Sequence, residues 1–451
     1  MSFLRRHRPV RAVKPASPFR PRLEELEDRC VPSTLTVSNT LDTGSAGDGS
    51  LRGEIAAASG GDQIVFAGSL AGKTITLTAA KGPLDINTNL TIDGAGSGIT
   101  VNGGGTRVFQ IDAGNTVAIN GLTIAGGHTG GFGSGGGIFN VGSLTLRNST
   151  VTGNSAFEGG GIFNGSGATM IMSGDTVTNN TSSGDNGGGI DNLGQLTILN
   201  CTIAANQAVD GGGIANGGVL RMANSTVASN TVVGPGAEGG GIATVGAELD
   251  LLNTIVFNPN SGAATQNDVN GQITRAQGNL FGSTVSIHGG GNLGGNQFNV
   301  NPLLGPLQNN GGPTATMALL PGSPALGHGV STSLIPGLSV PATDQRGDPR
   351  PANGIDVGAF QTQPPPAPAP APVAEGVVAA LVRVGKRRRL LVVVRYADSG
   401  AVKTMFWSAF QKPPFKAVGV VTVDSNGDGV ADAVLLLGWR HRKFRTLLVP
   451  V

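Results

Sequence analysis

Short runs of alternating hydrophobic and polar residues fill most of this chain, and between residues 135 and 258 they recur in a fixed order. The repeat is visible in five segments that each begin with three glycines: GGGIFNVGSLTLRNSTVTGN from Gly135, GGGIFNGSGATMIMSGDTVTNN from Gly159, GGGIDNLGQLTILNCTIAAN from Gly187, GGGIANGGVLRMANSTVASN from Gly211 and GGGIATVGAELDLLNTIVFN from Gly239. Their starting points are offset by 24, 28, 24 and 28 residues. A period that tolerates insertions is typical of a solenoid.

Each repeat contains three alternating runs, for example 137–140, 143–147 and 149–152, which are too short for helices and fit strands. Three strands per repeat predict a three-sided coil, with the strands of successive coils stacked in parallel about 4.8 Å apart. Equivalent positions should then form ladders through the core. One predicted ladder contains Ile138, Ile162, Ile190, Ile214 and Ile242, and the other contains Val151, Val177, Ile203, Val227 and Ile255.

Two columns of asparagine accompany these ladders. The first contains Asn140, Asn164, Asn192 and Asn216, and the second contains Asn154, Asn180, Asn206, Asn230 and Asn258. Asparagine tolerates the left-handed backbone conformation, and its amide can bond to an identical amide one coil away. We therefore expect both columns to be structural corners of the coil.

The coil length of 24 to 28 residues with irregular insertions predicts a right-handed parallel β-helix rather than a left-handed one built on hexapeptides. Looser repeats on both sides extend this β-helix over residues 34–300, about ten coils and about 50 Å of rod, and residues 301–362 complete the domain. The stretch 363–373, QPPPAPAPAPV, predicts an extended linker. Apolar runs within 374–451 predict a small antiparallel β domain of about six strands, and residues 1–33 form a basic leader.

Composition and charge narrow the class of partner. The 75 glycines and 4% aromatic residues do not describe an ordinary globular core. Residues 31–372 hold 9 basic and 19 acidic side chains, whereas residues 373–451 hold 13 basic and 5 acidic ones. An acidic rod argues against nucleic acid as a partner, and a basic tail suits anionic cell-envelope polymers or lipid head groups. No apolar run reaches the about 18 residues of a transmembrane span.

Three long stretches carry a family resemblance: SLRGEIAAASGGDQIVF from Ser50, NPLLGPLQNNGGPTATMALLPGSPALGHG from Asn301 and TDQRGDPRPANGIDVGAF from Thr343. Together with the repeats they resemble bacterial parallel β-helix proteins with a choice-of-anchor Q domain, related in style to the polymorphic outer-membrane proteins. This chain has Gln361 where the family usually ends on an acidic residue. The resemblance implies export and surface association through a C-terminal module, and no known catalytic activity. The segment PRLEELEDRCVPS from Pro21 is also similar to a leader of large bacterial surface proteins.

A candidate metal site lies near the C-terminus in the segment DSNGDGVAD. Oxygen ligands at positions 1, 3, 5, 7 and 9 of this loop would come from Asp424, Asn426, Asp428, the carbonyl of Val430, and Asp432. This spacing surrounds Ca²⁺, and it resembles the loops of FG-GAP and dockerin repeats. Leu435 stands where an EF-hand has its bidentate glutamate. We expect a structural calcium ion here, with a plain hairpin turn as the alternative.

A candidate catalytic site lies along one edge of the rod. The residues that precede four of the glycine triplets are Glu158, Asn186, Asp210 and Glu238. Asp210 and Glu238 should lie one coil apart, about 5 Å, which is close to the carboxyl separation of a retaining glycosidase. The pair therefore raises the hypothesis of a polysaccharide-degrading lyase or glycoside hydrolase.

Other residues weigh against that hypothesis. The repeats contain only two basic residues, Arg147 and Arg221, and both fall in strand runs. Aromatic platforms for sugars are expected to be scarce in the rod, since Trp407, Trp439 and Tyr396 all lie in the C-terminal domain. Solvated loop acids are the favoured interpretation of the edge.

The sequence thus favours a secreted or cell-surface rod with a structural or adhesive function, with contacts through its loops and retention through its C-terminal module. The alternative is the polysaccharide-degrading enzyme that acts through Asp210 and Glu238. We expect Cys201, which takes the place of Ser149 and Ser225 in its column, to be an unreactive packed thiol. The histidines His128, His288 and His328 lack the spacing of metal ligands.

Overall fold

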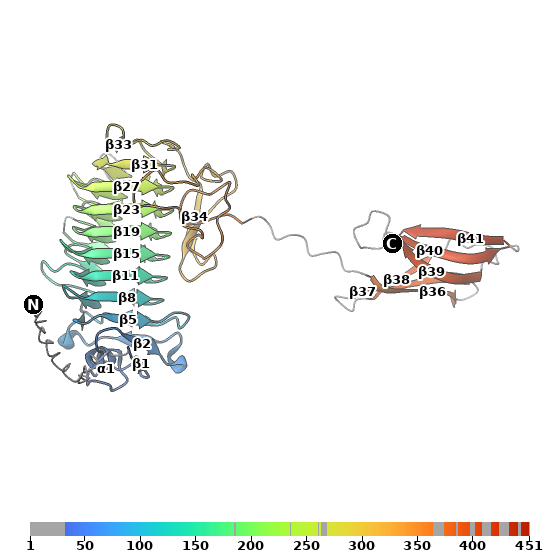
Figure 1. Cartoon of the computed structure of the whole chain (residues 1–451), viewed down its shortest axis with the longest axis horizontal. Coiled ribbons are helices and arrows are strands. Elements are labelled where there is room, and N and C mark those ends of the chain that lie inside the picture. The colour runs from blue at the N-terminus through green and yellow to red at the C-terminus, as the bar shows by residue number, and fades with distance from the viewer. Residues whose placement is uncertain are drawn as a thin grey trace, which may run out of the picture. The chain divides into compact units, whose positions relative to one another are not determined.

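A computed structural model of the chain describes residues 32–363, except 185, 235, 260 and 263–267, together with six strands between residues 374 and 450. The chain divides into two compact units, Met1–Gln363 and Pro364–Val451. The first unit is a parallel β-solenoid and the second contains antiparallel strands (Figure 1). The predicted all-β class is confirmed. The helices among the described residues are α1 (Leu51–Ala57) and the 3-10 turns η1 (Gly68–Leu70) and η2 (Ala79–Lys81).

Two of the solenoid's sheets, named A and B here, have ten and nine strands. Sheet A consists of β1 (Thr34–Val37), β2 (Asp62–Phe66), β5 (Leu90–Asp93), β8 (Thr116–Asn120), β11 (Ser143–Arg147), β15 (Thr169–Ser173), β19 (Gln195–Leu199), β23 (Val219–Ala223), β27 (Glu248–Leu252) and β31 (Arg275–Gln277). Sheet B consists of β3 (Thr74–Thr76), β6 (Thr100–Asn102), β9 (Thr123–Ala125), β12 (Thr150–Thr152), β16 (Thr176–Thr178), β20 (Thr202–Ala204), β24 (Thr226–Ala228), β28 (Ile255–Phe257) and β32 (Leu280–Phe281).

The other two solenoid sheets have eight and four strands. Sheet C consists of β4 (Leu84–Ile86), β7 (Phe109–Ile111), β10 (Ile138–Asn140), β14 (Ile162–Asn164), β18 (Ile190–Asn192), β22 (Ile214–Asn216), β26 (Ile242–Thr244) and β29 (Val269–Asn270). Sheet D consists of β13 (Ser155–Ala156), β17 (Thr181–Ser182), β21 (Gln207–Ala208) and β25 (Thr231–Val232). One further parallel pair, β30 (Gln272–Ile273) and β33 (Ser286–Ile287), follows the last long coils.

Each central coil passes through sheets C, A and B in that order, and the solenoid makes about nine turns, as the number of strands in sheet B indicates. The three-sided coil that the repeats predict is present. Sheet D adds a short fourth side, which the sequence analysis missed because its strands have only two residues each. Two residues are too few to show the alternation from which a strand is predicted.

The core ladders are confirmed except at one residue. Ile138, Ile162, Ile190, Ile214 and Ile242 pair in succession and are fully buried. In the second ladder Val227 pairs with Val256, and the prediction of Ile255 was wrong. The coil has three residues between β26 and β27 where the previous coil has two, so the frame moves by one. Ile255 therefore pairs with Thr226.

The asparagine columns are continuous hydrogen-bonded ladders. In the first, each buried amide Nδ2 donates to the Oδ1 of the next asparagine at 2.8 Å, from Asn140 through to Asn216. In the second, both the backbone N–H and the side-chain Nδ2 of each asparagine donate to the next Oδ1, from Asn154 through to Asn258. These bonds satisfy polar groups that would otherwise be buried without partners.

The left-handed corners lie at other positions than we predicted. Positive φ angles occur at Asn148, Asn200, Asn224 and Asn253, between sheets A and B, and not in the two ladders. Beside the second ladder, the left-handed residue is the one that precedes the asparagine, as at Asn179. The ladder asparagines use their amides for stacking, and a neighbouring residue makes the turn.

The N-terminal end of the core is closed by α1. The hydroxyl of Ser50 accepts a hydrogen bond from the Gly53 N–H and caps the helix. Leu51 and Ile55 are buried in the main core cluster, so the helix covers this end of the core. Within the described residues, α1 and the two 3-10 turns are all far shorter than a bilayer, and no helix qualifies as a membrane span.

Residues 301–362, which we call the cover segment, fold back over the outer face of sheet B. The segment contains the antiparallel pair β34 (Leu304–Gln308) and β35 (Thr316–Leu319). Buried threonines of sheet B bond to this segment. The Thr176 hydroxyl donates to the Ala315 carbonyl at 2.6 Å, and the Thr202 hydroxyl donates to Gln345 Oε1 at 2.6 Å. Ile255 packs beneath the same segment with Leu319 and Val357, so the frame shift provides an apolar outer contact.

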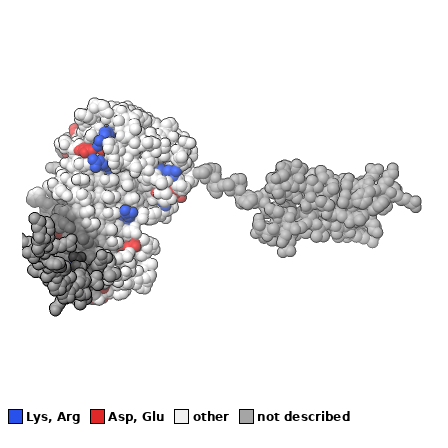
Figure 2. Space-filling model, in the orientation of Figure 1, with Lys and Arg blue, Asp and Glu red and all other residues white. Residues whose placement is uncertain are grey.

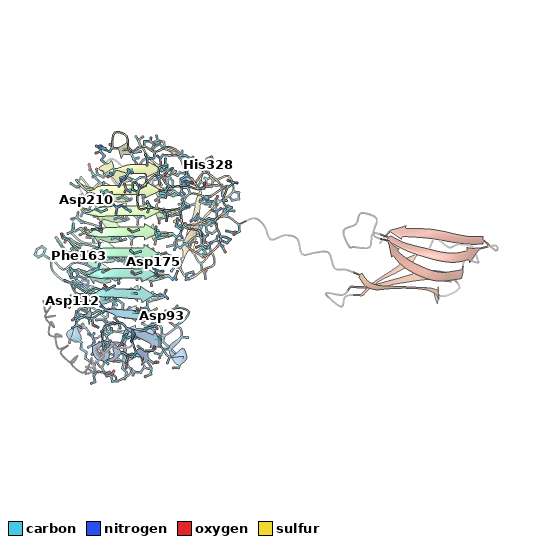
Figure 3. The ribbon with its side chains drawn as sticks, in the orientation of Figure 1. Asp93, Asp112, Phe163, Asp175, Asp210 and His328 are labelled. Atoms are coloured by element: carbon cyan, nitrogen blue, oxygen red, sulfur yellow. The ribbon has the colours of Figure 1, made fainter. Side chains whose placement is uncertain are left out.

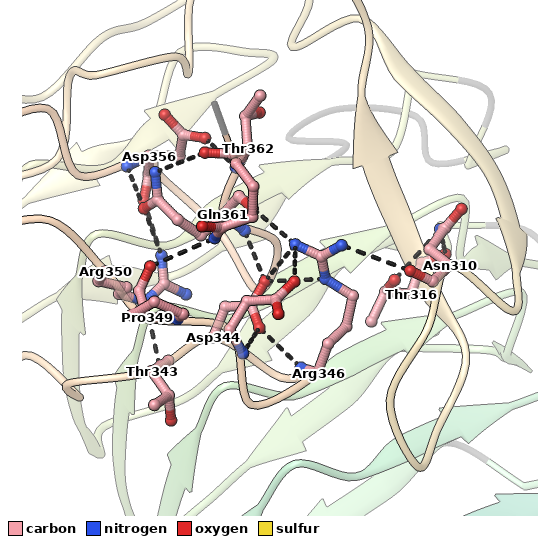
Figure 4. A network of polar contacts seen from close by, with 12 residues as sticks. Asn310, Thr316, Thr343, Asp344, Arg346, Pro349, Arg350, Asp356, Gln361 and Thr362 are labelled. Atoms are coloured by element: carbon pink, nitrogen blue, oxygen red, sulfur yellow. Dashed lines mark hydrogen bonds and ion pairs between the residues drawn. The ribbon is translucent and has the colours of Figure 1, made fainter. Parts of the chain in front are cut away.

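The segment that begins at Thr343 is the centre of a polar network within the cover segment (Figure 4). Arg346 pairs with Asp344 at 2.8 Å and lies over the Phe360 ring. Arg350 is buried and donates to Asn200 Oδ1 and to the Gly358 carbonyl; burial lowers its pKa to about 10. Gln361 Oε1 accepts from the Asp356 N–H at 2.9 Å, and the Gln361 N–H donates to Asp344 Oδ2 at 2.9 Å, so this buried residue is well bonded.

The second unit contains two antiparallel sheets of three strands each. One consists of β36 (Ala374–Val384), β37 (Arg387–Tyr396) and β38 (Val402–Trp407), and the other consists of β39 (Lys416–Val423), β40 (Ala433–Arg440) and β41 (Lys443–Pro450). The six strands agree with the small antiparallel β domain that the apolar runs predict.

Candidate functional site

The outer face of sheet C is the best candidate for a site, because chemically distinctive side chains stack there in register. The middle residue of each strand forms a column across the coils: Asp85, Gln110, Phe139, Phe163, Asp191, Ala215, Ala243 and Asn270. In each complete strand the two flanking residues are buried core or ladder positions. The middle residue therefore points outward by the alternation of a strand.

Two phenylalanines form an aromatic stack in this column. The rings of Phe139 and Phe163 lie 5.2 Å apart and are nearly parallel, at 6°. The Arg107 guanidinium lies 4.5 Å from the centre of the Phe139 ring, and it is held there by bonds to the carbonyls of Ser134 and Gly135. The sequence analysis considered only tryptophan and tyrosine as aromatic platforms and did not weigh these phenylalanines. The signal was present in the sequence as the repeated GGGIFN, in which Phe follows the buried isoleucine.

Asp191 follows Phe163 in the column and is buried in an unusual way. Only 2% of the residue is exposed, so its carboxyl group meets little solvent. Burial is the main cause that raises its pKa, to about 7, and repulsion from Glu158 adds to the effect. The side chain therefore takes up a proton at a higher pH than an ordinary aspartate does.

Glu158 immediately precedes the glycine triplet of the coil that contains Phe163. Its Oε2 accepts a hydrogen bond from the Ser134 hydroxyl at 3.2 Å. The preceding residue, Phe157, meets Phe132 edge to face with the ring centres 4.9 Å apart, and Phe132 is 85% exposed. A second aromatic pair thus lies on the loop that precedes this glycine triplet.

The glycine triplets allow the coils to approach closely at this edge. A Cβ atom on Gly160 would lie 2.4 Å from the carbonyl oxygen of Thr181 on the next coil. No side chain fits at such a position. The triplets therefore hold the acidic edge and the sheet C column against each other with little room for adjustment.

The predicted pair Asp210 and Glu238 lies on successive coils, with the Gly211 N–H bonded to the Glu238 carbonyl. Asp210 Oδ1 accepts from the backbone N–H of Glu238 at 2.9 Å, and Glu238 Oε2 accepts from Asn270 Nδ2 at 2.6 Å. Each carboxylate therefore has a structural bond, and their catalytic role stays a prediction. Figure 3 places Asp210 and Phe163 along the same side of the solenoid.

The outer face of sheet A has a different character. Figure 2 shows it with few charged side chains. One charged cluster joins three successive strands of sheet A, β23, β27 and β31. The fully buried Asp250 carboxylate pairs with Arg275 at 2.6 Å and lies 3.5 Å from the Arg221 guanidinium. Glu248 contacts both arginines. Opposite charges one coil apart stabilise the sheet, and this pairing accounts for Arg221 without a catalytic role.

The remaining predicted residues fall into two groups. Cys201 is fully buried, its Sγ accepts from the Asp175 N–H at 3.4 Å, and burial raises the pKa of the thiol, as expected for a packed residue. Within the described residues, no three His, Cys, Asp or Glu side chains gather to hold a metal ion. The predicted calcium ligands Asp424, Asn426, Asp428, Val430 and Asp432 lie outside the described residues.

No protein-family model and no curated protein matches this chain. The fold therefore follows from the repeats and the structure. What the solenoid does must be inferred from its own surface.

Proposed function

We propose that the protein is a bacterial secreted or cell-surface rod with a structural or adhesive function, and that it contacts a cell-envelope polymer through the outer face of sheet C. The observation that carries this proposal is the column from Gln110 to Asn270, in which amide, aromatic and acidic side chains lie in register along the rod, interrupted by two alanines. A linear ligand of repeating units is the natural complement of a surface that repeats at the coil spacing of about 4.8 Å.

The cover segment supports the same proposal. Its sequence resembles the choice-of-anchor Q region, a resemblance that implies export, and its docking buries the outer face of sheet B at β16, β20 and β24. Sheet C is not covered by this segment in any described contact. The outward contacts of the rod are therefore assigned to sheet C and its loops.

The C-terminal unit is proposed to retain the rod at the surface, with a calcium ion held by the FG-GAP-like or dockerin-like loop from Asp424 to Asp432. The basic character of residues 373–451 suits an anionic polymer or lipid head group. Calorimetric titration of the full chain with Ca²⁺, beside Asp428→Ala, tests the metal. Saturable binding that the substitution removes is expected, and equal binding by both proteins would assign the calcium to another place.

The surface location is tested by treating intact bacterial cells that produce the full chain with a protease. We expect the rod to be degraded from outside while a cytoplasmic marker stays intact. A rod that resists until the cells are broken would overturn the proposal.

The two carboxylates on successive coils favour one alternative, a polysaccharide lyase or glycoside hydrolase that acts through Asp210 and Glu238. Asp210→Ala and Glu238→Ala test it on a panel of acidic and neutral polysaccharides. Cleavage that is lost in both variants would support the enzyme. Cleavage that survives both would remove this pair, and no cleavage by the unsubstituted protein would leave the binding rod.

A further inference from the structure

The cover segment is a separate piece of structure that no strand pairing ties to the solenoid. Its strands β34 and β35 pair with each other, and sheet B is complete without them. The segment is held on sheet B by individual contacts along one column of threonines. Besides the bonds of Thr176 and Thr202, Thr226 Oγ1 accepts from the Ala359 N–H at 3.0 Å. The cover segment can therefore leave sheet B, or dock on it, as one unit.

The contact between the cover segment and the solenoid is incomplete at one buried residue. In the column of left-handed corners, the Asn200 amide donates to the Thr343 carbonyl of the cover segment at 2.8 Å. The Asn253 amide likewise donates to the Val330 carbonyl at 2.8 Å. Asn224 lies between these two corners and is fully buried, and within the described residues its Oδ1 and Nδ2 have no hydrogen-bond partner. A buried amide without partners is costly, so this contact opens more readily than a fully bonded one.

The connection into the cover segment contains a strained backbone. Asn301, Pro302 and Leu303 join the last coil to β34, and Leu303 has a φ of 50°. The other described non-glycine residues with a positive φ are asparagine, alanine and serine, whereas a bulky leucine is strained there. The Leu303 N–H donates to Asn301 Oδ1 and its carbonyl accepts from the Leu320 N–H, both at 2.9 Å, which hold it in this conformation. Pro302 has a fixed φ and cannot absorb the strain. A short strained hinge favours the exchange of the element that it connects.

We propose that two copies of this chain exchange their cover segments, so that residues 301–362 of each copy dock on sheet B of the other. Every contact that the cover segment makes with its own solenoid is then made between the copies, because the residues on both sides are the same. The connection 301–303 opens in each copy, and Leu303 leaves the left-handed region. This inference goes beyond the proposed function, since it gives the rod a second rod as partner and makes no use of sheet C.

The state of association tests the strained hinge. The full chain is refolded at high concentration, and its mass is followed by sedimentation velocity over a dilution series. Leu303→Gly removes the strain from the closed chain, so we expect the dissociation constant of the dimer to rise about tenfold or more. Leu303→Val, with a branched Cβ, should shift the chain toward the dimer. Leu41→Gly changes a leucine that is 59% exposed and is not among the residues with positive φ, and it should leave the dissociation constant unchanged.

A disulfide between two chains tests the exchange itself. One version carries Thr226→Cys and the other carries Ala359→Cys, and the two are unfolded together and refolded under oxidising conditions. The two thiols meet only where the cover segment of one chain lies on sheet B of the other. We expect this disulfide in the dimer, identified by mass spectrometry of the joined peptides. A single chain with both substitutions is the control, because it should close the same bridge within the monomer and so show that the geometry permits it.

Each other outcome overturns the proposal. A chain that stays monomeric at every concentration has no exchanged form. A dimer without the disulfide between chains, while the doubly substituted monomer closes its bridge, would be held together by another surface. Equal dissociation constants for Leu303→Gly and the unsubstituted chain would remove the strained hinge as the cause. A monomeric chain that is nevertheless exposed on cells would refute the exchange and leave the surface rod standing.

Discussion

The asparagine ladder beside sheet D provides a sharp test of what stabilises the solenoid. The Asn180 side chain makes four hydrogen bonds: Oδ1 accepts from the N–H and the Nδ2 of Asn154, and Nδ2 donates to the Val151 carbonyl and to Asn206 Oδ1. In Asn180→Ala the buried Asn154 N–H loses this acceptor, and its Nδ2 keeps only the Ile124 carbonyl. One orphaned buried donor costs about 1–3 kcal/mol, and the vacated volume adds to this. We expect a total loss of about 3 kcal/mol.

The preceding residue offers a matched control. Asn179 is exposed and has a φ of 55°, so Asn179→Gly keeps the backbone conformation and should change the free energy of unfolding by less than about 0.5 kcal/mol. Guanidinium unfolding of the full chain, followed by far-ultraviolet circular dichroism, measures both variants. Hydrogen exchange at the Asn154 amide adds a local measurement, and protection there should fall in Asn180→Ala only. Equal stability of the two variants would refute the claim that the ladder holds the coils together.

Three further outcomes follow from the packing. Burial raises the pKa of Asp175 to about 8 from 3.8, so between these pH values the folded chain holds a proton that the unfolded chain has released. The contribution of Asp175 to the free energy of unfolding is therefore complete below about pH 4 and is lost as the pH rises through 8. Asp175→Asn should therefore flatten the dependence of the melting temperature on pH in this window, and an unchanged slope would assign the titration to other groups. Deletion of one whole coil, Gly135 to Glu158, should leave a folded protein because every ladder is rejoined in register, whereas deletion of half of it should not; circular dichroism distinguishes the two. Arg350→Ala removes the buried donors that bond the cover segment to Asn200. Residues 301–362 should then become sensitive to protease at a lower temperature than in the control Arg147→Ala, which changes an exposed residue. Equal sensitivity of the two variants would show that the threonine contacts are enough to hold the cover segment in place.

The repeats predict most of the solenoid because a parallel coil brings equivalent positions together by translation. Ile138 and its equivalents can be aligned by eye, and their pairing follows without any further information. Ile255 breaks the rule because the insertion that shifts its frame lies ten residues earlier, between β26 and β27, and a glycine-rich turn gives no sign of which residues it has gained. Sequence alone shows that an insertion has occurred. It does not show that Val256 enters the core while Ile255 faces the cover segment.

The candidate site was harder to predict because its residues are brought into one column only by the register of sheet C. Asp191 is one acidic residue among several along the edge, and only the structure distinguishes it from Asp210, whose carboxylate bonds to the next coil. The Phe139 and Phe163 stack was predictable in principle from the repeated GGGIFN. It was overlooked because tryptophan and tyrosine were taken as the markers of a sugar site.

The two asparagine ladders also have a direction. In both ladders each Nδ2 donates to the asparagine Oδ1 one coil closer to the C-terminus, so the amide dipoles add along the rod. The last amide of a ladder therefore leaves a donor that a further coil could use. Such a surface would recruit a coil from another molecule as easily as one of its own, as the growing end of an amyloid fibril does. In the second ladder Asn258 donates its N–H not to an asparagine but to the carboxylate of Asp268. A carboxyl group has no N–H to donate onward, so the amide ladder ends at this coil, while β31 and β32 continue sheets A and B beyond it.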